Sequence, residues 1–166
     1  MSIATWYFSE NTPAAPTSGT AALSVNPVSG ASQLQYANGV LSAVDLDNAA
    51  SLAFVGKFPQ AVGGTYQVVV QTSLDEGNSW QDLASFPVIT TSGGTVQYTG
   101  TVSQGYPTAF VASGSGTAPA LSAGAVINSA WGNKLRLAIV ANAGTSAGVG
   151  ISVEVSAKQM ATRRNG

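Results

Sequence analysis

The chain has 166 residues, a formal net charge of −1, and neither cysteine nor histidine. Charged residues make up only 8% of it, against about a quarter in an average soluble protein. The length fits one domain with its own core, and the missing residue types exclude disulfides, thiolate metal sites and imidazole-based catalysis. A surface with so few charges loses little free energy of hydration when it is buried, so the composition predisposes the chain to assembly.

The few basic residues are not arranged for binding nucleic acid. Five of the six lie in the last 33 positions, and no charge occurs from Leu83 to Asn133. Because a nucleic-acid site needs a basic face clustered along one element, we expect no nucleic-acid partner. The opening MSIATWYFSE lacks the basic start and apolar run of a signal peptide, and no segment approaches a membrane span. We therefore expect no membrane partner, and a location in the cytoplasm or in a particle assembled there.

The N-terminal residues 1–20 are predicted to form an extended arm, since they contain Pro13, Pro16 and the aromatic cluster Trp6-Tyr7-Phe8. Exposed aromatics are costly, so these three side chains are expected to dock onto a sandwich face or a neighbouring subunit. Residues 21–160 are predicted to form one β-sandwich domain, and residues 161–166 a flexible tail. Within that domain, residues 40–50 have an ambiguous pattern that a short helix would also satisfy.

From residue 52 onward the apolar residues recur mainly at period two, which predicts strands. The consecutive valines 68–70 predict a strand covered on both faces. Glycine-rich turns and prolines separate the runs. About eight strands at this spacing predict an all-β fold, an antiparallel sandwich of jelly-roll type. Six of the candidate strands are 52–58, 66–72, 80–86, 95–102, 134–139 and 150–158.

The connection LDEGNS, between the strands at 67–73 and 80–86, has the residue types of a tight hairpin. Ser73, Asp75, Gly77 and Trp80 match the spacing of the Asp-box hairpin of sialidases and other β-propellers, in which the Asp and Trp are structural. A propeller repeats such a unit in every blade, roughly every 40–45 residues, whereas this chain has one copy. The motif therefore predicts a structural hairpin rather than a sialidase.

A wider segment, about residues 64–158, resembles small β-rich virion proteins of tailed bacteriophages. The resemblance rests on YQVVVQTSLDEGNSWQDLASF, a Gly/Thr-rich stretch, and KLRLAIVAN with GVGISVEVSAKQ. It implies a non-enzymatic structural protein of the virion, and we favour a capsid decoration (cement) protein that binds the major capsid protein on the capsid surface. A homo-oligomer, with a trimer as the expected state, would bury low-charge surface between capsomers. The segments expected to reach a neighbour are Trp6-Tyr7-Phe8 and Arg163-Arg164.

Catalytic, cofactor and metal sites are not expected. Hydrolysis would need two carboxyls facing one cleft. Asp45 and Asp47 have a spacing that could hold calcium, but the further oxygen ligands of an EF-hand are missing, so a solvated loop is the preferred interpretation. The whole pool of carboxylates is Glu10, Asp45, Asp47, Asp75, Glu76, Asp82 and Glu154.

Two alternative functions stay open. Trp80 and Trp131 could be sugar-stacking platforms of a carbohydrate-binding module on a tail or fibre, although packing over the hairpin and at one end of the sandwich is the preferred interpretation. A neck or tail accessory protein would instead assemble as a ring. One chain's sequence does not distinguish these symmetries.

Overall fold

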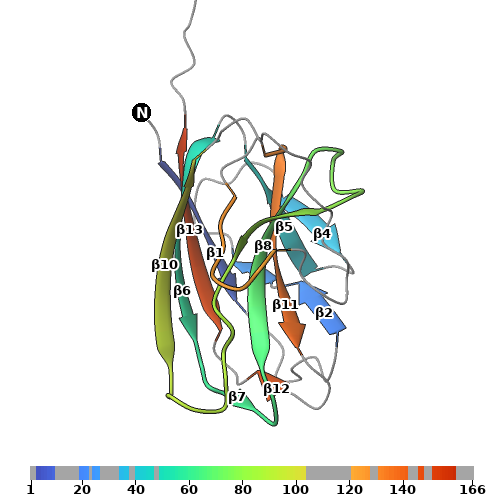
Figure 1. Ribbon diagram of the computed structural model, residues 1–166. Coiled ribbons are helices and arrows are strands. Elements are labelled where there is room, and N and C mark those ends of the chain that lie inside the picture. The colour runs from blue at the N-terminus through green and yellow to red at the C-terminus, as the bar shows by residue number, and fades with distance from the viewer. Residues whose placement is uncertain are drawn as a thin grey trace, which may run out of the picture.

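A computed structural model describes residues 3–9, 19–22, 24–26, 34–37, 40–46, 49–103, 121–127, 131–141, 146–147 and 151–159. These residues form strands and their connections, with no helix among them. Two antiparallel sheets stand face to face, with β10, β6, β13 and β1 in one layer and β8, β11 and β5 in the other (Figure 1). The predicted all-β antiparallel sandwich is confirmed.

Each sheet is built from strands that are distant in sequence. The first sheet has the order β10 (Val96–Ser103), β6 (Ala49–Phe58), β13 (Ser152–Gln159), β1 (Ile3–Ser9) and β3 (Ser24–Asn26). The second sheet has the order β4 (Leu34–Ala37), β5 (Val40–Asp45), β11 (Lys134–Ala141), β8 (Tyr66–Ser73) and β9 (Gln81–Ser85), with β2 (Gly19–Ala22) also paired to β11. A small third sheet pairs β7 (Ala61–Val62) with β12 (Ser146–Ala147).

The connectivity is that of a jelly roll. Eight of the strands that the structure describes have five or more residues, and in chain order they are β1, β5, β6, β8, β9, β10, β11 and β13. The first, third, sixth and eighth lie in one sheet, and the second, fourth, fifth and seventh lie in the other. The chain therefore crosses repeatedly between the sheets, as two interlocked Greek keys require.

The core lies between the two sheets and follows the alternation of the strands. In β13, Val153, Val155 and Ala157 are fully buried, while the side chains between them are partly exposed. All eight residues of β8 are buried, which confirms the strand predicted to be covered on both faces. Three large aromatics meet at one end of the core: Phe58 packs on Phe86 at 4.8 Å between centroids and on Tyr98 at 6.0 Å.

The structure corrects the expectation of an N-terminal arm. Residues 3–9 form β1, which pairs with β13 along its whole length and with β3 on its other edge. Trp6 and Phe8 point into the core, with exposed fractions of 4% and 0%, and Tyr7 points outward. The prediction of an arm and the domain boundary at residue 20 are therefore wrong for these residues, because backbone pairing makes β1 part of the sandwich. Where they are described, the ambiguous residues 40–50 form strand β5 and the beginning of strand β6, not a helix.

Candidate interaction surface

The hairpin between β8 and β9 is closed by Ser73 and Asp75. The Ser73 hydroxyl donates to Asp75 Oδ1 at 2.7 Å and accepts from the backbone N–H of Gly77 at 2.7 Å. Asp75 Oδ1 also accepts the Ser79 N–H at 2.8 Å, and Oδ2 accepts the Ser79 hydroxyl at 2.7 Å. Each carboxylate oxygen of Asp75 therefore accepts hydrogen bonds within the turn that joins β8 to β9.

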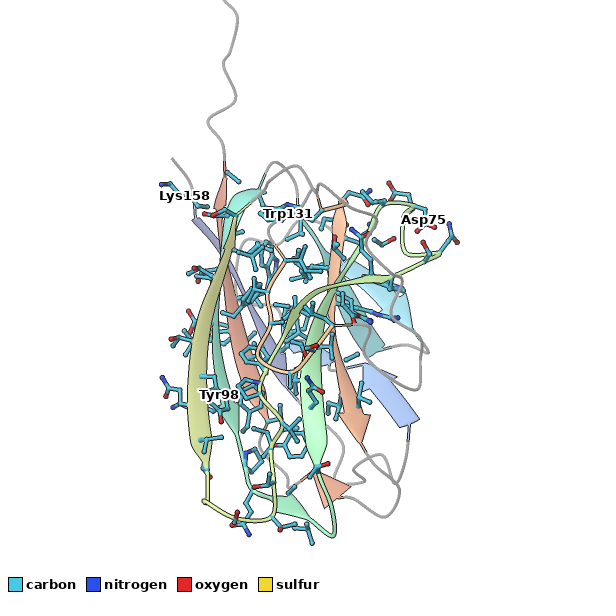
Figure 2. The ribbon with its side chains drawn as sticks, in the orientation of Figure 1. Asp75, Tyr98, Trp131 and Lys158 are labelled. Atoms are coloured by element: carbon cyan, nitrogen blue, oxygen red, sulfur yellow. The ribbon has the colours of Figure 1, made fainter. Side chains whose placement is uncertain are left out.

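The same hydrogen bonds set the acidity of Asp75. Donation from the Ser79 side chain, then from the Ser79 backbone and the Ser73 side chain, lowers the pKa of Asp75 from 3.8 to about 2. The backbone beside it is left-handed, since Glu76 and Gly77 have positive φ angles of 61° and 95°, which glycine adopts without strain. The carboxyl group projects from the second sheet at one end of the sandwich (Figure 2). A group that stays ionised and fully hydrogen-bonded in a turn is poorly suited to general acid or base chemistry.

The residue that follows the turn, Trp80, is held by a polar network that sequence reasoning did not find. The guanidinium of Arg136 lies over its ring at 4.3 Å, and Arg136 Nε donates to Gln71 Oε1 at 2.8 Å. Gln71 Nε2 donates in turn to Asp82 Oδ1 at 2.7 Å, and Asp82 Oδ2 accepts the Leu121 N–H at 3.1 Å. Burial lowers the pKa of Arg136, and the charge of Asp82 opposes that shift. This network ties β8, β9 and β11 together.

Asp45 does not lie in a solvated loop. It is the last residue of β5, and its carboxylate forms an ion pair with Lys134, whose partner on the other side is Glu76 at 3.8 Å. The prediction of a solvated loop is wrong for Asp45, since strand pairing places it directly opposite Lys134. Asp47 and Glu10 lie outside the described residues. Within the described chain, no three Asp or Glu side chains gather as metal ligands.

The tryptophans are poorly placed to bind sugars. Trp131 is only 6% exposed and lies between the two sheets near one end of the sandwich (Figure 2). One face of the Trp80 ring is covered by Arg136. Of the residues expected to contact a neighbour, Trp6 and Phe8 belong to the core and Tyr7 is 38% exposed, whereas Arg163 and Arg164 lie outside the described residues.

Tyr7 is part of a broad outward surface that spans β1, β13, β6 and β10, here called the outer face of the first sheet. The pairing registers place side chains in rows across it, such as Tyr7, Glu154, Val55 and Thr99. Only three of its fourteen described side chains are charged, and most of the others are Ser or Thr. The fourteen are Thr5, Tyr7, Ser51, Ala53, Val55, Lys57, Gln97, Thr99, Thr101, Ser103, Ser152, Glu154, Ser156 and Lys158.

Most side chains of the outer face are short and uncharged, and the face is hollowed at one end. An open hollow of about 550 Å³ is lined by Ser51, Ala53, Thr101, Ser156 and neighbouring residues. Four strands spaced ~4.8 Å apart and ~8 residues long cover roughly 500 Å² in projection, more than half of the ~800 Å² that one partner contributes to a standard interface. A partner that covered this face would displace water from few charged groups.

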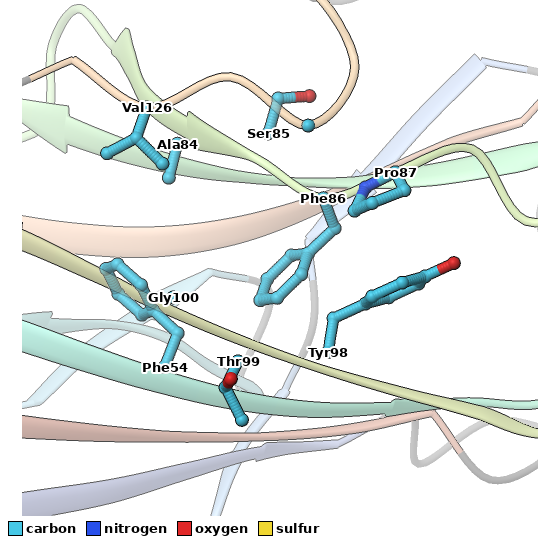
Figure 3. Close-up of a pocket in the computed structure, with 10 residues that line it drawn as sticks. Phe54, Ala84, Ser85, Phe86, Pro87, Tyr98, Thr99, Gly100 and Val126 are labelled. Atoms are coloured by element: carbon cyan, nitrogen blue, oxygen red, sulfur yellow. The ribbon is translucent and has the colours of Figure 1, made fainter.

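A second feature lies where the sandwich opens beside β10. A pocket of about 140 Å³ is enclosed by aromatic and small side chains from both sheets, including Phe54, Phe86, Tyr98, Gly100 and Val126 (Figure 3). A Cβ atom added at Gly100 would meet nothing within 4 Å. The pocket is therefore apolar and borders the free side of β10.

Comparison with known proteins finds similarity in structure but not in sequence. No protein-family model matches the chain, and no curated protein matches it. Among solved structures, the chain is similar to Eiger TNF from S. frugiperda, with 11% identity, a TM-score of 0.44, and coverage of 99% of this chain and 98% of that chain. In the described part of the chain, no helix is long and apolar enough to cross a membrane.

Proposed function

We propose that the chain is a non-enzymatic structural protein of a tailed-phage virion, and specifically a capsid decoration protein that binds the major capsid protein. The observation that carries this proposal is the outer face of the first sheet, which is broad, regular and built mostly of short uncharged side chains. The resemblance of residues 64–158 to small phage virion proteins supports it independently. The proposed action is mechanical: contacts between copies and with capsomers add binding free energy that must be lost before the shell opens.

The geometry suggests how such contacts would be made. The outer face alone offers roughly 500 Å² in projection, so a single contact would be modest and several simultaneous contacts would be needed for tight binding. A homo-oligomer, with a trimer as the expected state, would present several such faces to neighbouring capsomers at once. Short Ser, Thr and Ala side chains lose little conformational entropy on burial, which favours an adhesive role for this face.

A carbohydrate-binding role is less well supported. It would require aromatic rings with accessible faces, whereas Trp131 is buried and Trp80 is covered on one face by Arg136. A neck or tail accessory protein would use the same kind of neutral face, and the partner decides between that role and capsid decoration.

The test measures binding to capsid shells that lack this protein, followed by light scattering and co-sedimentation. We compare Val55→Lys, on the outer face, with Val62→Lys, on β7; the two valines are 37% and 61% exposed. We expect Val55→Lys to weaken shell binding about tenfold or more and Val62→Lys to leave it unchanged, with equal melting temperatures. Failure of the wild-type protein to bind shells at all would refute the proposal, and binding to isolated necks or tails instead would favour the accessory role.

A further inference from the structure

The edge of β10 stands out among the sheet edges that the structure describes. An unpaired strand edge is a template for another strand, and proteins usually protect it by shortening, charging, bulging or covering it. The edge of β9 is covered, because Ser85 and Leu83 exchange backbone hydrogen bonds of 2.9 Å with the segment 121–127. At the far edge of the first sheet, β3 has only three residues. At the far edge of the second sheet, β4 has only four residues, and its pairing with β5 carries a register shift.

Among the described residues, none of these protective features is seen at β10. It has eight residues, VQYTGTVS, without a charge or a proline, and it pairs with β6 in unbroken register. Among the described residues, none pairs with its other edge from Val96 to Val102. Gln97, Thr99 and Thr101 are exposed, and β10 forms the margin of its layer (Figure 1). Within the part of the chain that the structure describes, no strand therefore takes the backbone groups on this edge.

We propose that this edge binds the β10 edge of a second copy of the chain, antiparallel, about a twofold axis at Thr99. This inference goes beyond the proposed function and does not depend on it, because the twofold contact is separate from the contacts within the expected trimer. In an antiparallel pair, side chains on the same face must lie opposite one another, so the axis must pass through a residue rather than between two residues. In this register Val96 lies opposite Val102 of the second copy, and Gln97 lies opposite Thr101 of the second copy.

The choice of Thr99 follows from Tyr98 and Gly100. With the axis at Thr99, Tyr98 of each copy lies opposite Gly100 of the other, where an added Cβ would meet nothing within 4 Å. An aromatic side chain opposite a strand glycine covers the exposed backbone and stabilises the pair. An axis at Gly100 would leave two glycines facing each other, and an axis at Tyr98 would crowd two tyrosines together.

The apolar pocket supports the same occupant. It opens beside Gly100 and is lined by Phe54, Phe86 and Val126 (Figure 3). An aromatic ring that approached Gly100 from a second strand would cover this apolar surface. With no charge on either strand, two copies meet without like-charge repulsion, and the contact is self-complementary as a twofold interface requires. A highly charged strand from another protein would lack these matches.

The test uses the absence of cysteine from the chain. We expect Thr99→Cys to form a disulfide-linked dimer under mild oxidation, because residue 99 faces its own copy across the axis. Thr101→Cys should not, since its two copies would be offset by four residues, about 13 Å, beyond disulfide reach. The double variant Gln97→Cys with Thr101→Cys should crosslink again. Val55→Cys, one strand further from the edge, is the matched control and should remain uncrosslinked.

A second variant measures affinity rather than proximity. Thr99→Lys places two ammonium groups opposite each other at the axis, so self-association measured by dilution should weaken about tenfold or more, with an unchanged melting temperature. The proposal is overturned if Thr99→Cys does not crosslink in solution, or if Thr101→Cys alone crosslinks equally well. Because residue 99 is probed independently of shell binding, either proposal can fail while the other stands.

Discussion

The guanidinium of Arg136 stacks over the ring of Trp80, with Cζ 4.3 Å from the ring centroid. The pair joins β11 to Trp80, the residue just before β9. Arg136 donates a hydrogen bond to Gln71, which donates in turn to the buried carboxylate of Asp82. The hairpin, whose own hydrogen bonds are local, is thereby fixed to the second sheet by a chain of interactions between strands.

Removing the carboxylate of Asp82 should destabilise the fold. Asp82 is 2% exposed, and Asp82→Ala leaves the Gln71 amide and the Leu121 N–H without their acceptor. We expect a loss of about 2–4 kcal/mol in the free energy of unfolding, measured by urea denaturation. Glu154→Ala, on the outer face of the first sheet, is the control and should change stability by less than about 0.5 kcal/mol. Equal stabilities for the two variants would contradict this account of the network.

The stabilising effect of Asp75 should disappear in acid. Its pKa in the folded protein, about 2, lies below the ordinary value of 3.8, so the ionised form is favoured by folding. The contribution is complete above about pH 4, shrinks as the pH falls, and is lost below pH 2. We expect Asp75→Asn to melt below the wild type at neutral pH and to converge with it in this window. Ser79→Ala should raise the pKa of Asp75, as measured by carboxyl NMR titration; an unchanged value would contradict the assigned cause.

Replacement by alanine should destabilise the fold at one glycine and leave its stability unchanged at another. A Cβ at Gly132 would overlap the backbone carbonyl of Ser73 and lie 2.6 Å from the Leu74 nitrogen, so the backbone itself would have to move. We expect Gly132→Ala to cost about 2–4 kcal/mol in unfolding free energy. Gly100→Ala, where nothing lies within 4 Å, should leave stability within about 0.5 kcal/mol of the wild type. Thermal unfolding of both variants, followed by circular dichroism, provides the comparison.

The position of β1 can be tested with neighbouring aromatics. Phe8 is fully buried and Tyr7 is 38% exposed, so Phe8→Ala should cost about 3–5 kcal/mol and Tyr7→Ala less than about 1 kcal/mol. Two small and similar effects in denaturant unfolding would indicate an arm rather than a core strand. For the same reason, deleting residues 1–12 removes a core strand and does not isolate a contact with a neighbour.

Several features of this protein were determined by the sequence alone. The alternation in residues 150–158 located β13 because a strand exposes every second side chain, and consecutive valines located β8 because its two faces are buried. The turn at Asp75 was also predictable, since its hydrogen bonds join residues at most four positions apart. Local periodicity and local hydrogen bonding leave a direct trace in sequence.

Other features were decided only by the tertiary structure. Trp6, Tyr7 and Phe8 alternate between core and solvent, but three aromatics in a row conceal that alternation, and pairing with β13 from the far end of the chain settles it. The contact of Arg136 with Trp80, and the rows that bring Tyr7 beside Glu154 and Val55, depend on which strands become neighbours. Strand order is fixed by burial of the whole core and by closure of long loops. Both depend on segments that are distant in sequence, so no single segment predicts them.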